Sequence, residues 1–230
     1  MTDLVDTTEM YLRTIYDLEE EGIVPLRARI SERLGHSGPT VSQTIGRMER
    51  DGLVRVEGDR HLEFTPEGRS RALHVMRKHR LAERLLHDVI GLDWSLVHDE
   101  ACRWEHVMSE QVERRLLEVL DNPTESPYGN PIPALEEIGG KASRPFLEGV
   151  VNIVERVRDE DAPISAHIRR LGEPVQFEPE LLEQLRTAGV VPGAQATISS
   201  AGGYVLVRVD GFGEGLELPP EVAVHVYVAT

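Results

Sequence analysis

Two short amphipathic segments joined by a glycine turn constrain the fold of this chain more than any other feature. Apolar residues recur at intervals of three and four in residues 26–34 and again in residues 41–48, which is the pattern of a helix with one buried face. Gly35-His36-Ser37-Gly38 lies between them, with Ser37 placed to cap the second helix and Pro39 in its first turn. The sequence therefore predicts a helix-turn-helix unit.

A two-stranded hairpin is predicted directly after the second helix. Asp51-Gly52 ends that helix, and residues 53–56 and 61–64 alternate apolar with polar side chains on either side of Glu57-Gly58-Asp59-Arg60. A hairpin in this position forms the wing of a winged helix. A further helix is expected before the helix-turn-helix, over residues 7–20, where Tyr11, Ile15 and Leu18 share one face.

The outward face of the second helix is suited to the major groove of DNA. Small side chains stand near its start, Gln43 can hydrogen-bond a base edge, and arginines behind it can contact phosphates. A solvated polar face is the alternative for each residue taken singly, whereas the set favours DNA. The predicted DNA contacts are Arg27, Ser37, Pro39, Thr40, Ser42, Gln43, Arg47, Arg50 and Arg60.

The charge of the chain argues against general nucleic-acid binding, because the formal net charge is -15 at pH 7. Residues 26–60 differ from the rest, since they carry seven arginines against five acidic residues. We therefore expect DNA contact only through this locally basic face. The single cysteine excludes an internal disulfide, and the start of the chain lacks a signal peptide, so we expect a cytoplasmic protein. No apolar run approaches the length of a membrane span, so no membrane partner is expected.

Side chains that bind metals are concentrated in residues 79–106. His98, Cys102 and either Glu105 or His106 recur at intervals of three and four, which places them on one stripe of a helix. His79 and Glu83 repeat the same interval on the preceding segment. The alternative is that the carboxylates are solvated while the histidines and Cys102 fill an ordinary helix interface. The only cysteine of the chain lies within this group, and thiol, imidazole and carboxylate together form a metal-ligand inventory.

Three further helices are expected before the proline-rich segment that begins at residue 121. Thr65-Pro66 begins a long helix that runs toward Ile90, Ser95 is placed to cap the helix of the metal ligands, and residues 110–120 form another. Together these helices expose more apolar surface than a small domain needs, which indicates a homodimer.

The last part of the chain is predicted to be a small β-barrel. Residues 121–145 are rich in proline and predict a linker. Short β patterns follow at residues 150–157, 196–199, 203–209 and 222–228, interrupted by a short helix at 179–188, and they suggest an SH3-like fold. We therefore expect a mainly α protein with a small β part. Its expected domains are a winged helix-turn-helix over residues 1–73, a helical metal-binding and dimerisation domain over 74–140, and a linker end with an SH3-like domain over 141–230.

Four blocks of the sequence resemble one family over the length of the chain. The chain is similar to the iron-dependent repressor family, which includes the diphtheria toxin repressor and the mycobacterial iron regulator. The matching blocks are LVDTTEMYLRTIY at residues 4–16, SGPTVSQT at 37–44, RKHRLAERLL at 77–86 and EACRWEHVMS at 100–109. The barrel resembles the third domain of the family more loosely.

The resemblance implies two metal sites in each subunit. A regulatory site would comprise Met10, Cys102, Glu105 and His106, and an ancillary site would comprise His79, Glu83, His98, Glu173 and Gln176. The implied metal is iron(II), two ions per subunit, for which cobalt, nickel, zinc or manganese would substitute in vitro. The implied function is a repressor that binds double-stranded operator DNA as a homodimer when loaded with iron, as one dimer or as two, and controls genes of iron homeostasis.

Two other classes of function remain open from the residues alone. A metalloenzyme would use the His, Cys and Glu cluster for chemistry, although the chain has no HExxH motif to supply a base beside the metal. A helix-turn-helix regulator that senses a small organic ligand would leave this cluster without a purpose. Met10 also has an ordinary alternative, since a methionine on a helix face commonly fills a gap in the core.

Overall fold

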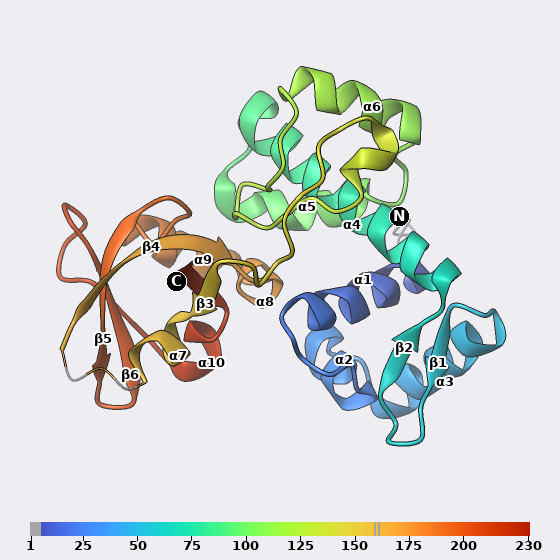
Figure 1. Cartoon of the computed structure of the whole chain (residues 1–230), viewed down its shortest axis with the longest axis horizontal. Helices are drawn as coiled ribbons and strands as arrows, with labels where there is room; N and C mark the ends of the chain where they lie inside the picture. Colours follow the sequence, from blue (N-terminus) through green and yellow to red (C-terminus); the bar gives the residue numbers. More distant parts are fainter. Residues whose placement is uncertain (1–5, 159, 161) are drawn as a thin grey trace. The chain divides into compact units, whose positions relative to one another are not determined.

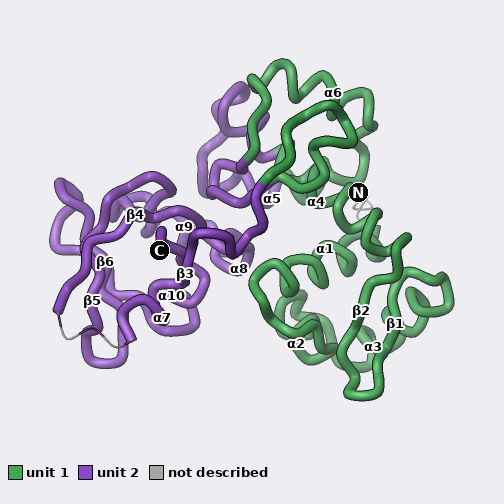
Figure 2. The backbone as a smooth tube through the Cα atoms, in the orientation of Figure 1, with its two compact units in different colours: residues 1–82, 101–124, 132–143 green, residues 83–100, 125–131, 144–230 purple. Residues whose placement is uncertain are grey.

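The computed structural model describes residues 6–158, 160 and 162–230, so residues 1–5 of the predicted DNA-binding domain, including Leu4-Val5 of the family block, lie outside the described part. The chain divides into two compact units (Figure 2). Unit 1 comprises residues 1–82, 101–124 and 132–143, and unit 2 comprises residues 83–100, 125–131 and 144–230. Each unit thus gathers segments that are far apart in the sequence.

The winged helix of unit 1 has the order of elements that the sequence predicts (Figure 1). Its elements are α1 (Thr7–Glu20), α2 (Arg27–Leu34), α3 (Gly38–Arg50), β1 (Val54–Val56) and β2 (Leu62–Phe64). Ser37 caps α3, because its side chain accepts a hydrogen bond from the Thr40 backbone N–H. Gly35 ends α2 with a φ of 64°, which is a backbone conformation that favours glycine. The helix-turn-helix and its wing are therefore confirmed.

One apolar core holds the three helices and the hairpin together. Its fully buried side chains include Tyr11, Leu12, Ile15, Ile30, Val41, Ile45, Met48 and Leu62. The following helix is α4 (Pro66–Leu85). Its first turn packs closely against the winged helix, since a Cβ atom on Gly68 would lie only 1.8 Å from the carbonyl oxygen of Leu53. Only glycine permits this approach.

Helical segments follow the wing, and two of them, α4 and α5 (Val97–Trp104), carry predicted metal ligands. A π-helical turn, Leu86–Ile90, extends α4 to the predicted end, and α5 and α6 (Glu110–Val119) follow. The predicted cap at Ser95 is wrong. The Asp93 side chain instead accepts a hydrogen bond from the Ser95 backbone N–H and begins a 3-10 turn, Trp94–Leu96, that leads into α5.

The proline-rich segment after α6 is mostly irregular, as predicted, and it is also packed. Its only named element among the described residues is a 3-10 turn, Leu135–Ile138. Leu135 is fully buried within unit 1, and Tyr128 is fully buried within unit 2. This segment is therefore part of the two cores and does not behave as a solvated linker.

An antiparallel sheet of six strands forms the end of unit 2 (Figure 1). The strand order is β3-β8-β4-β5-β6-β7, which confirms the predicted small β part. The strands are β3 (Val150–Asn152), β4 (Ile164–Leu171), β5 (Gln195–Ala201), β6 (Tyr204–Val209), β7 (Leu216–Leu218) and β8 (Val226–Ala229), and the helices α8 (Glu173–Gln176) and α9 (Pro179–Thr187) follow β4.

Two predicted strands are shorter than the sequence pattern suggested. Residues 150–157 form β3 and then a helix, α7 (Ile153–Val157), because the Asn152 side chain caps that helix at Glu155. Residues 222–228 begin in α10 (Pro220–Ala223) and become extended only at Val226. Pro220 at the start of α10 favours this helical turn. The alternation of apolar residues alone predicted strands, because it takes no account of the cap at Asn152 or of Pro220.

No helix within the described ranges is both long and apolar enough to cross a membrane.

Candidate functional site

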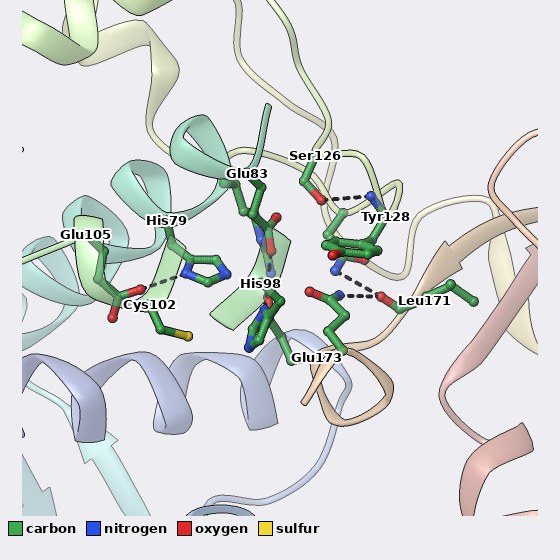
Figure 3. Close-up of polar contacts among 12 residues, drawn as sticks. His79, Glu83, His98, Cys102, Glu105, Ser126, Tyr128, Leu171 and Glu173 are labelled. Carbon is green, nitrogen blue, oxygen red and sulfur yellow. Dashed lines mark hydrogen bonds and ion pairs between the residues drawn. The ribbon is translucent and has the colours of Figure 1, made fainter. Parts of the chain in front are cut away.

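Unit 1 contains a cluster of two buried side chains and one partly buried side chain that can bind a metal. α4 supplies His79, α5 supplies Cys102, and Glu105 follows α5 directly. One ligand atom from each residue lies within 4.8 Å of the other two. The Nδ1 atom of His79 is 2.7 Å from Oε2 of Glu105, and Figure 3 shows this contact with the thiol of Cys102 beside it. His79 was predicted for the other metal site, so its closeness to Glu105 was not expected.

Arg13 reaches this cluster from α1. Its Nη1 atom donates hydrogen bonds to Oε2 of Glu105 at 2.7 Å and to Sγ of Cys102 at 3.1 Å, and it lies 2.9 Å from Nδ1 of His79. Arg13 is 3% exposed and Glu105 is 1% exposed, so this ion pair is withdrawn from water. Sequence reasoning missed Arg13, although it follows Met10 by three residues and so shares a helix face with it.

The positive charge of Arg13 changes the ionisation of the buried carboxylate. Burial alone would raise the pKa of Glu105, but the nearby Arg13 and the hydrogen bond with His79 together hold this pKa below its ordinary value. Glu105 is therefore a carboxylate at neutral pH. An ionised, buried carboxylate beside a thiol and an imidazole can bind a divalent cation.

His106 and Glu9 lie next to the cluster. The Nδ1 atom of His106 is 2.6 Å from Oε2 of Glu9, and its Nε2 atom is 3.4 Å from Oε1 of Glu105. Burial acts to lower the pKa of His106, yet the hydrogen bond with Glu9 and the charge of Glu105 raise it above its usual value. Sequence reasoning did not select Glu9, which directly precedes the predicted ligand Met10.

Met10 is placed on α1, where it is partly buried and packs against the apolar core of the winged helix. It lies one helical turn before Arg13. The described contacts of Met10 are thus those of a core methionine, and its predicted role as a ligand stays a prediction.

Unit 2 contains a second buried group of potential ligands. The Nδ1 atom of His98 lies 3.3 Å from Oε1 of Glu83 and 3.6 Å from Oε2 of Glu173. These side chains come from α5, α4 and α8 (Figure 3). The ring of Phe177 meets that of His98 edge-on, with the ring centroids 4.6 Å apart. The structure thus brings Glu173 to His98, as the resemblance implied for the ancillary site, and His79, which the resemblance also implied for that site, lies one turn before Glu83 on α4.

Gln176 is fully buried on α8, and only one side of its amide is used. Its Nε2 atom donates a hydrogen bond to the carbonyl oxygen of Leu171 at 2.8 Å. Its Oε1 atom is buried without a hydrogen-bond partner among the described residues. A buried acceptor without a donor is costly, and a metal ion would satisfy it. Both clusters therefore fit a divalent cation, the first with a soft thiol donor and the second with oxygen and imidazole donors.

The predicted DNA contacts lie on or beside α3 and the wing, except Arg27, which is the first residue of α2. All of them are exposed except Arg27, which is half-buried. A hollow next to α3 is lined by Thr7, Gln43, Thr44, Arg47 and Arg50. Gln43, Arg47 and Arg50 therefore line one concave surface.

A hydrogen bond joins α1 to the turn that precedes α3. The hydroxyl group of the fully buried Tyr11 lies 2.9 Å from Nδ1 of His36, and the two rings are 5.7 Å apart. The carbonyl oxygen of His36 in turn accepts a hydrogen bond from the hydroxyl of Ser31 on α2. Tyr11 is adjacent to Met10, so α1, which carries Met10 and Arg13, also supports the start of α3.

Comparison with known proteins assigns both helical parts of the chain. Residues 3–62 match the family model of the iron dependent repressor N-terminal DNA binding domain, and residues 65–134 match that of the iron dependent repressor metal binding and dimerisation domain. The iron-dependent repressor IdeR of Mycobacterium tuberculosis is 59% identical over 230 residues, which cover 99% of each chain. The diphtheria toxin repressor of Corynebacterium glutamicum is 58% identical over 229 residues, which cover 99% of this chain and 98% of the relative.

Solved structures agree with this assignment over nearly the whole chain. The crystal structure of IdeR from T. acidophilum superposes with a TM-score of 0.75 at 28% identity, covering 98% of both chains. A manganese-dependent transcriptional repressor in complex with manganese superposes with a TM-score of 0.80 at 25% identity, covering 97% of this chain and 100% of that one. The chain therefore belongs to the iron-dependent repressor family.

Proposed function

We propose that this protein is a metal-dependent transcriptional repressor that binds operator DNA as a homodimer when it is loaded with iron(II), and that it controls genes of iron homeostasis in the cytoplasm. The observation that carries the proposal is the buried group of His79, Cys102 and Glu105, which is joined by hydrogen bonds to the first helix of the winged helix. The family supports the same function, since its named members are transcriptional repressors and not enzymes.

The donor atoms support iron(II) and two ions per subunit. A thiolate, imidazoles and carboxylates suit iron, cobalt, nickel or zinc better than magnesium or calcium, and manganese would substitute in vitro at the oxygen-rich second cluster. Zinc binds such donors more tightly than iron does. Selectivity for iron would therefore depend on which metal the cell makes available.

The regulatory site is proposed to comprise Met10, Cys102, Glu105 and His106. Glu105 lies within 3.4 Å of His106 and beside the thiol of Cys102. Met10 enters this set from α1. A bound divalent cation supplies the attraction that holds thiolate, carboxylate and imidazole together. Met10 is the only proposed ligand on α1, so its ligation would fix that helix against the cluster.

The ancillary site is proposed to comprise His79, Glu83, His98, Glu173 and Gln176. The buried Oε1 atom of Gln176 and the short distances from His98 to the two carboxylates support this set. His79 joins it through its position one turn before Glu83 on α4. Glu173 and Gln176 would make metal binding contribute to the stability of unit 2.

The switch is proposed to run through α1. A metal changes DNA affinity only when it binds one conformation more tightly than another. Fixing α1 would fix Tyr11, whose hydroxyl supports His36 in the turn before α3. The recognition helix would then be presented in one orientation. A coupling of ~1–3 kcal/mol, which is typical of allosteric proteins, corresponds to roughly a 5- to 150-fold change in affinity.

Readout of the operator is proposed to rest on α3 and the wing. Gln43 would read a base edge, while Arg47, Arg50 and Arg60 would take phosphates. Replacing Gln43 by Ala should relax discrimination at one base position by ~1–3 kcal/mol. Replacing Arg47 by Ala should instead weaken binding to all sequences and flatten its salt dependence. Equal losses on operator and random DNA for Gln43→Ala would assign the readout to another residue.

Dimerisation is proposed to use apolar side chains that the single chain leaves exposed. Val107, Val112 and Val119 of unit 1 are 47–65% exposed. Two copies that bury such a surface form a two-fold dimer, and two-fold proteins suit two-fold operators. Whether one or two dimers share an operator would follow from the stoichiometry of the complex. The proposed functional division is DNA binding by residues 1–73, metal binding and dimerisation by 74–140, and support of the ancillary site by 141–230.

Binding to operator DNA with and without iron(II) under anaerobic conditions tests the proposal directly. The wild-type protein should shift operator DNA only when iron is present, and random DNA of the same length should not compete. A Cys102→Ala variant serves as the control, since it removes a donor and leaves a small side chain. Metal-independent binding by the wild-type protein would contradict the proposed switch, and metal binding without any DNA shift would favour a metalloenzyme.

A further inference from the structure

Arg13 places a positive charge at the centre of the donor atoms of unit 1. Its Nη1 atom lies 2.7 Å from Glu105, 2.9 Å from His79 and 3.1 Å from Cys102. We propose that the guanidinium group of Arg13 competes with the metal ion for these donors and must withdraw before the ion can bind. Arg13 would then be a positioning residue that sets the metal concentration at which the protein is activated. This inference rests on the proposed metal-dependent function.

The distances make the two cations mutually exclusive. Metal bonds to nitrogen, oxygen and sulfur are about 2.0–2.3 Å long, and the three donor atoms lie within 4.8 Å of one another. An ion bonded to Glu105 and Cys102, the two donors that belong to the proposed regulatory site, would lie close to both atoms, and Nη1 of Arg13 already lies 2.7 Å and 3.1 Å from them. The two positive charges cannot occupy this position together. Withdrawal of Arg13 is therefore part of metal binding.

Leaving the cluster is costly for Arg13 because the pair is buried. A guanidinium group does not lose its proton in a protein, so the charge itself must move. The side chains of Arg13 and Glu105 are 4% and 1% exposed, and a buried charge that loses its partner destabilises the fold strongly. The ion must replace both the charge and the hydrogen bonds that Arg13 supplies to Glu105 and Cys102. The apparent metal affinity of the protein would thus be lower than that of the same donors without Arg13.

The competition also acts on the helix that leads to the DNA-binding unit. Arg13 and Met10 are one turn apart on α1, so α1 contacts the cluster through Arg13 in this structure and would contact it through Met10 in the metal-loaded protein. Because the two side chains are offset by one turn along the same face, we expect the exchange to be accompanied by a shift of α1. The same exchange would therefore admit the metal and move the helix that carries Tyr11.

Cobalt(II) titration of the full-length protein measures this competition at one site. Cys102 is the only cysteine of the chain, so a thiolate-to-cobalt absorption band reports on this cluster alone. Arg13→Met and Arg13→Gln remove the charge, and Arg13→Lys keeps it. We expect both neutral variants to bind cobalt about tenfold more tightly or better, because the metal no longer displaces a buried cation. Arg13→Lys should stay near the wild-type affinity.

A second buried ion pair, Arg77 with Glu113, supplies the matched control for the Arg13 variants. Arg77 donates to Glu113 at 2.5 Å, and the side chains are 3% and 1% exposed, within unit 1 but outside the metal cluster. Arg77→Met should lower the melting temperature of the metal-free and cobalt-loaded protein equally and leave the cobalt affinity unchanged. The neutral Arg13 variants should have a lower melting temperature than the wild type in the absence of metal. This difference should be smaller when both proteins are saturated with cobalt.

The outcomes separate this inference from the function on which it rests. Equal cobalt affinities for the wild type and the neutral Arg13 variants would overturn the competition, and so would equal losses of stability with and without cobalt. Failure of both neutral variants to fold even with saturating cobalt would also overturn it, because Arg13 would then be needed in the loaded protein. Absence of the thiolate band in the wild type would overturn the proposed regulatory site itself.

Discussion

The two buried clusters of potential ligands differ in how their charges are balanced. In unit 1, a thiol, an imidazole and a carboxylate surround the guanidinium group of Arg13, within 3.1 Å. In unit 2, Nδ1 of His98 lies close to the carboxylates of Glu83 and Glu173, and the buried amide oxygen of Gln176 on α8 has no hydrogen-bond partner within the described part of the chain. The first arrangement is satisfied by a cation that belongs to the chain. The second retains an acceptor that an added cation would satisfy.

This difference suggests a division of labour between the clusters. A site from which a side chain must withdraw couples metal binding to movement of that side chain, so the cluster of unit 1 is suited to a switch. A site that contains an unsatisfied acceptor gains stability from the metal without such an exchange. The cluster of unit 2 is therefore suited to support. Both statements can be tested with variants that alter one cluster at a time.

The largest effect is expected from Cys102→Ala. The substitution removes the soft donor of the unit 1 cluster and leaves the fold intact, since Cys102 is only partly buried. Activation of DNA binding by iron should fall by at least about 100-fold, at the upper end of losses for altered metal sites. A gel-shift titration with iron(II) under anaerobic conditions measures this. A variant that is still activated at the wild-type iron concentration would make Cys102 a core residue and remove the distinction between the clusters.

A smaller effect is expected when the unit 2 cluster loses its α8 donors. Glu173→Ala with Gln176→Ala should raise the iron concentration for half-maximal DNA binding about tenfold without abolishing the response. Val175→Ala is the matched control, because Val175 is buried on the same short helix and offers no donor atom. Its iron titration should match that of the wild type. If the double variant and the control behave alike, α8 contributes packing and no ligands.

The smallest effect is expected from Tyr11→Phe, which leaves both clusters untouched. The phenyl ring keeps the packing of Tyr11 and loses the hydroxyl contacts with His36 and with Thr44 of α3. Metal-loaded protein should bind operator DNA about twofold to tenfold more weakly, corresponding to the ~0.5–1.5 kcal/mol of one hydrogen bond. The cobalt affinity of the metal-binding sites should change little in the absence of DNA.

Tyr16→Phe is the matched control for this variant. Tyr16 is also on α1, but its hydroxyl interacts with Glu20 of the same helix. Operator binding by Tyr16→Phe should equal that of the wild type. Equal weakening by both variants would mean that α1 acts through its general stability and not through the contact of Tyr11 with the turn before α3.

Local signals in the sequence predicted the winged helix well. The apolar periodicity of residues 26–34 and 41–48, the glycine turn and the Ser37 cap are all short-range features, and short-range features determine where helices begin and end. In residues 150–157 and 222–228, the alternation of apolar residues predicted strands where part of each segment is helical. There, the cap at Asn152 and the start at Pro220 outweighed the alternating apolar residues.

The sequence predicted which residues supply donor atoms better than it predicted which of these residues lie close together. Spacing selected His79, Glu83, His98 and Cys102, and all of them except the partly buried Cys102 are fully buried in the structure. Glu9 and Arg13 were not selected, because a charged residue on an amphipathic helix is usually solvated. Only the packing of α1 reveals that Arg13 is buried and faces residues that follow it by 66 to 92 positions.

The sequence by itself determined the local structure of the DNA-binding unit and the kinds of donor atoms available, because helix periodicity, caps and side-chain chemistry are properties of a few neighbouring residues. The tertiary structure alone decided which donors meet. It brought Arg13 to Cys102 across 89 residues, joined Glu173 of α8 to His98 of α5, and set Tyr11 against His36. The physical reason is that such contacts depend on how whole helices pack, and packing is settled by the summed burial of many side chains.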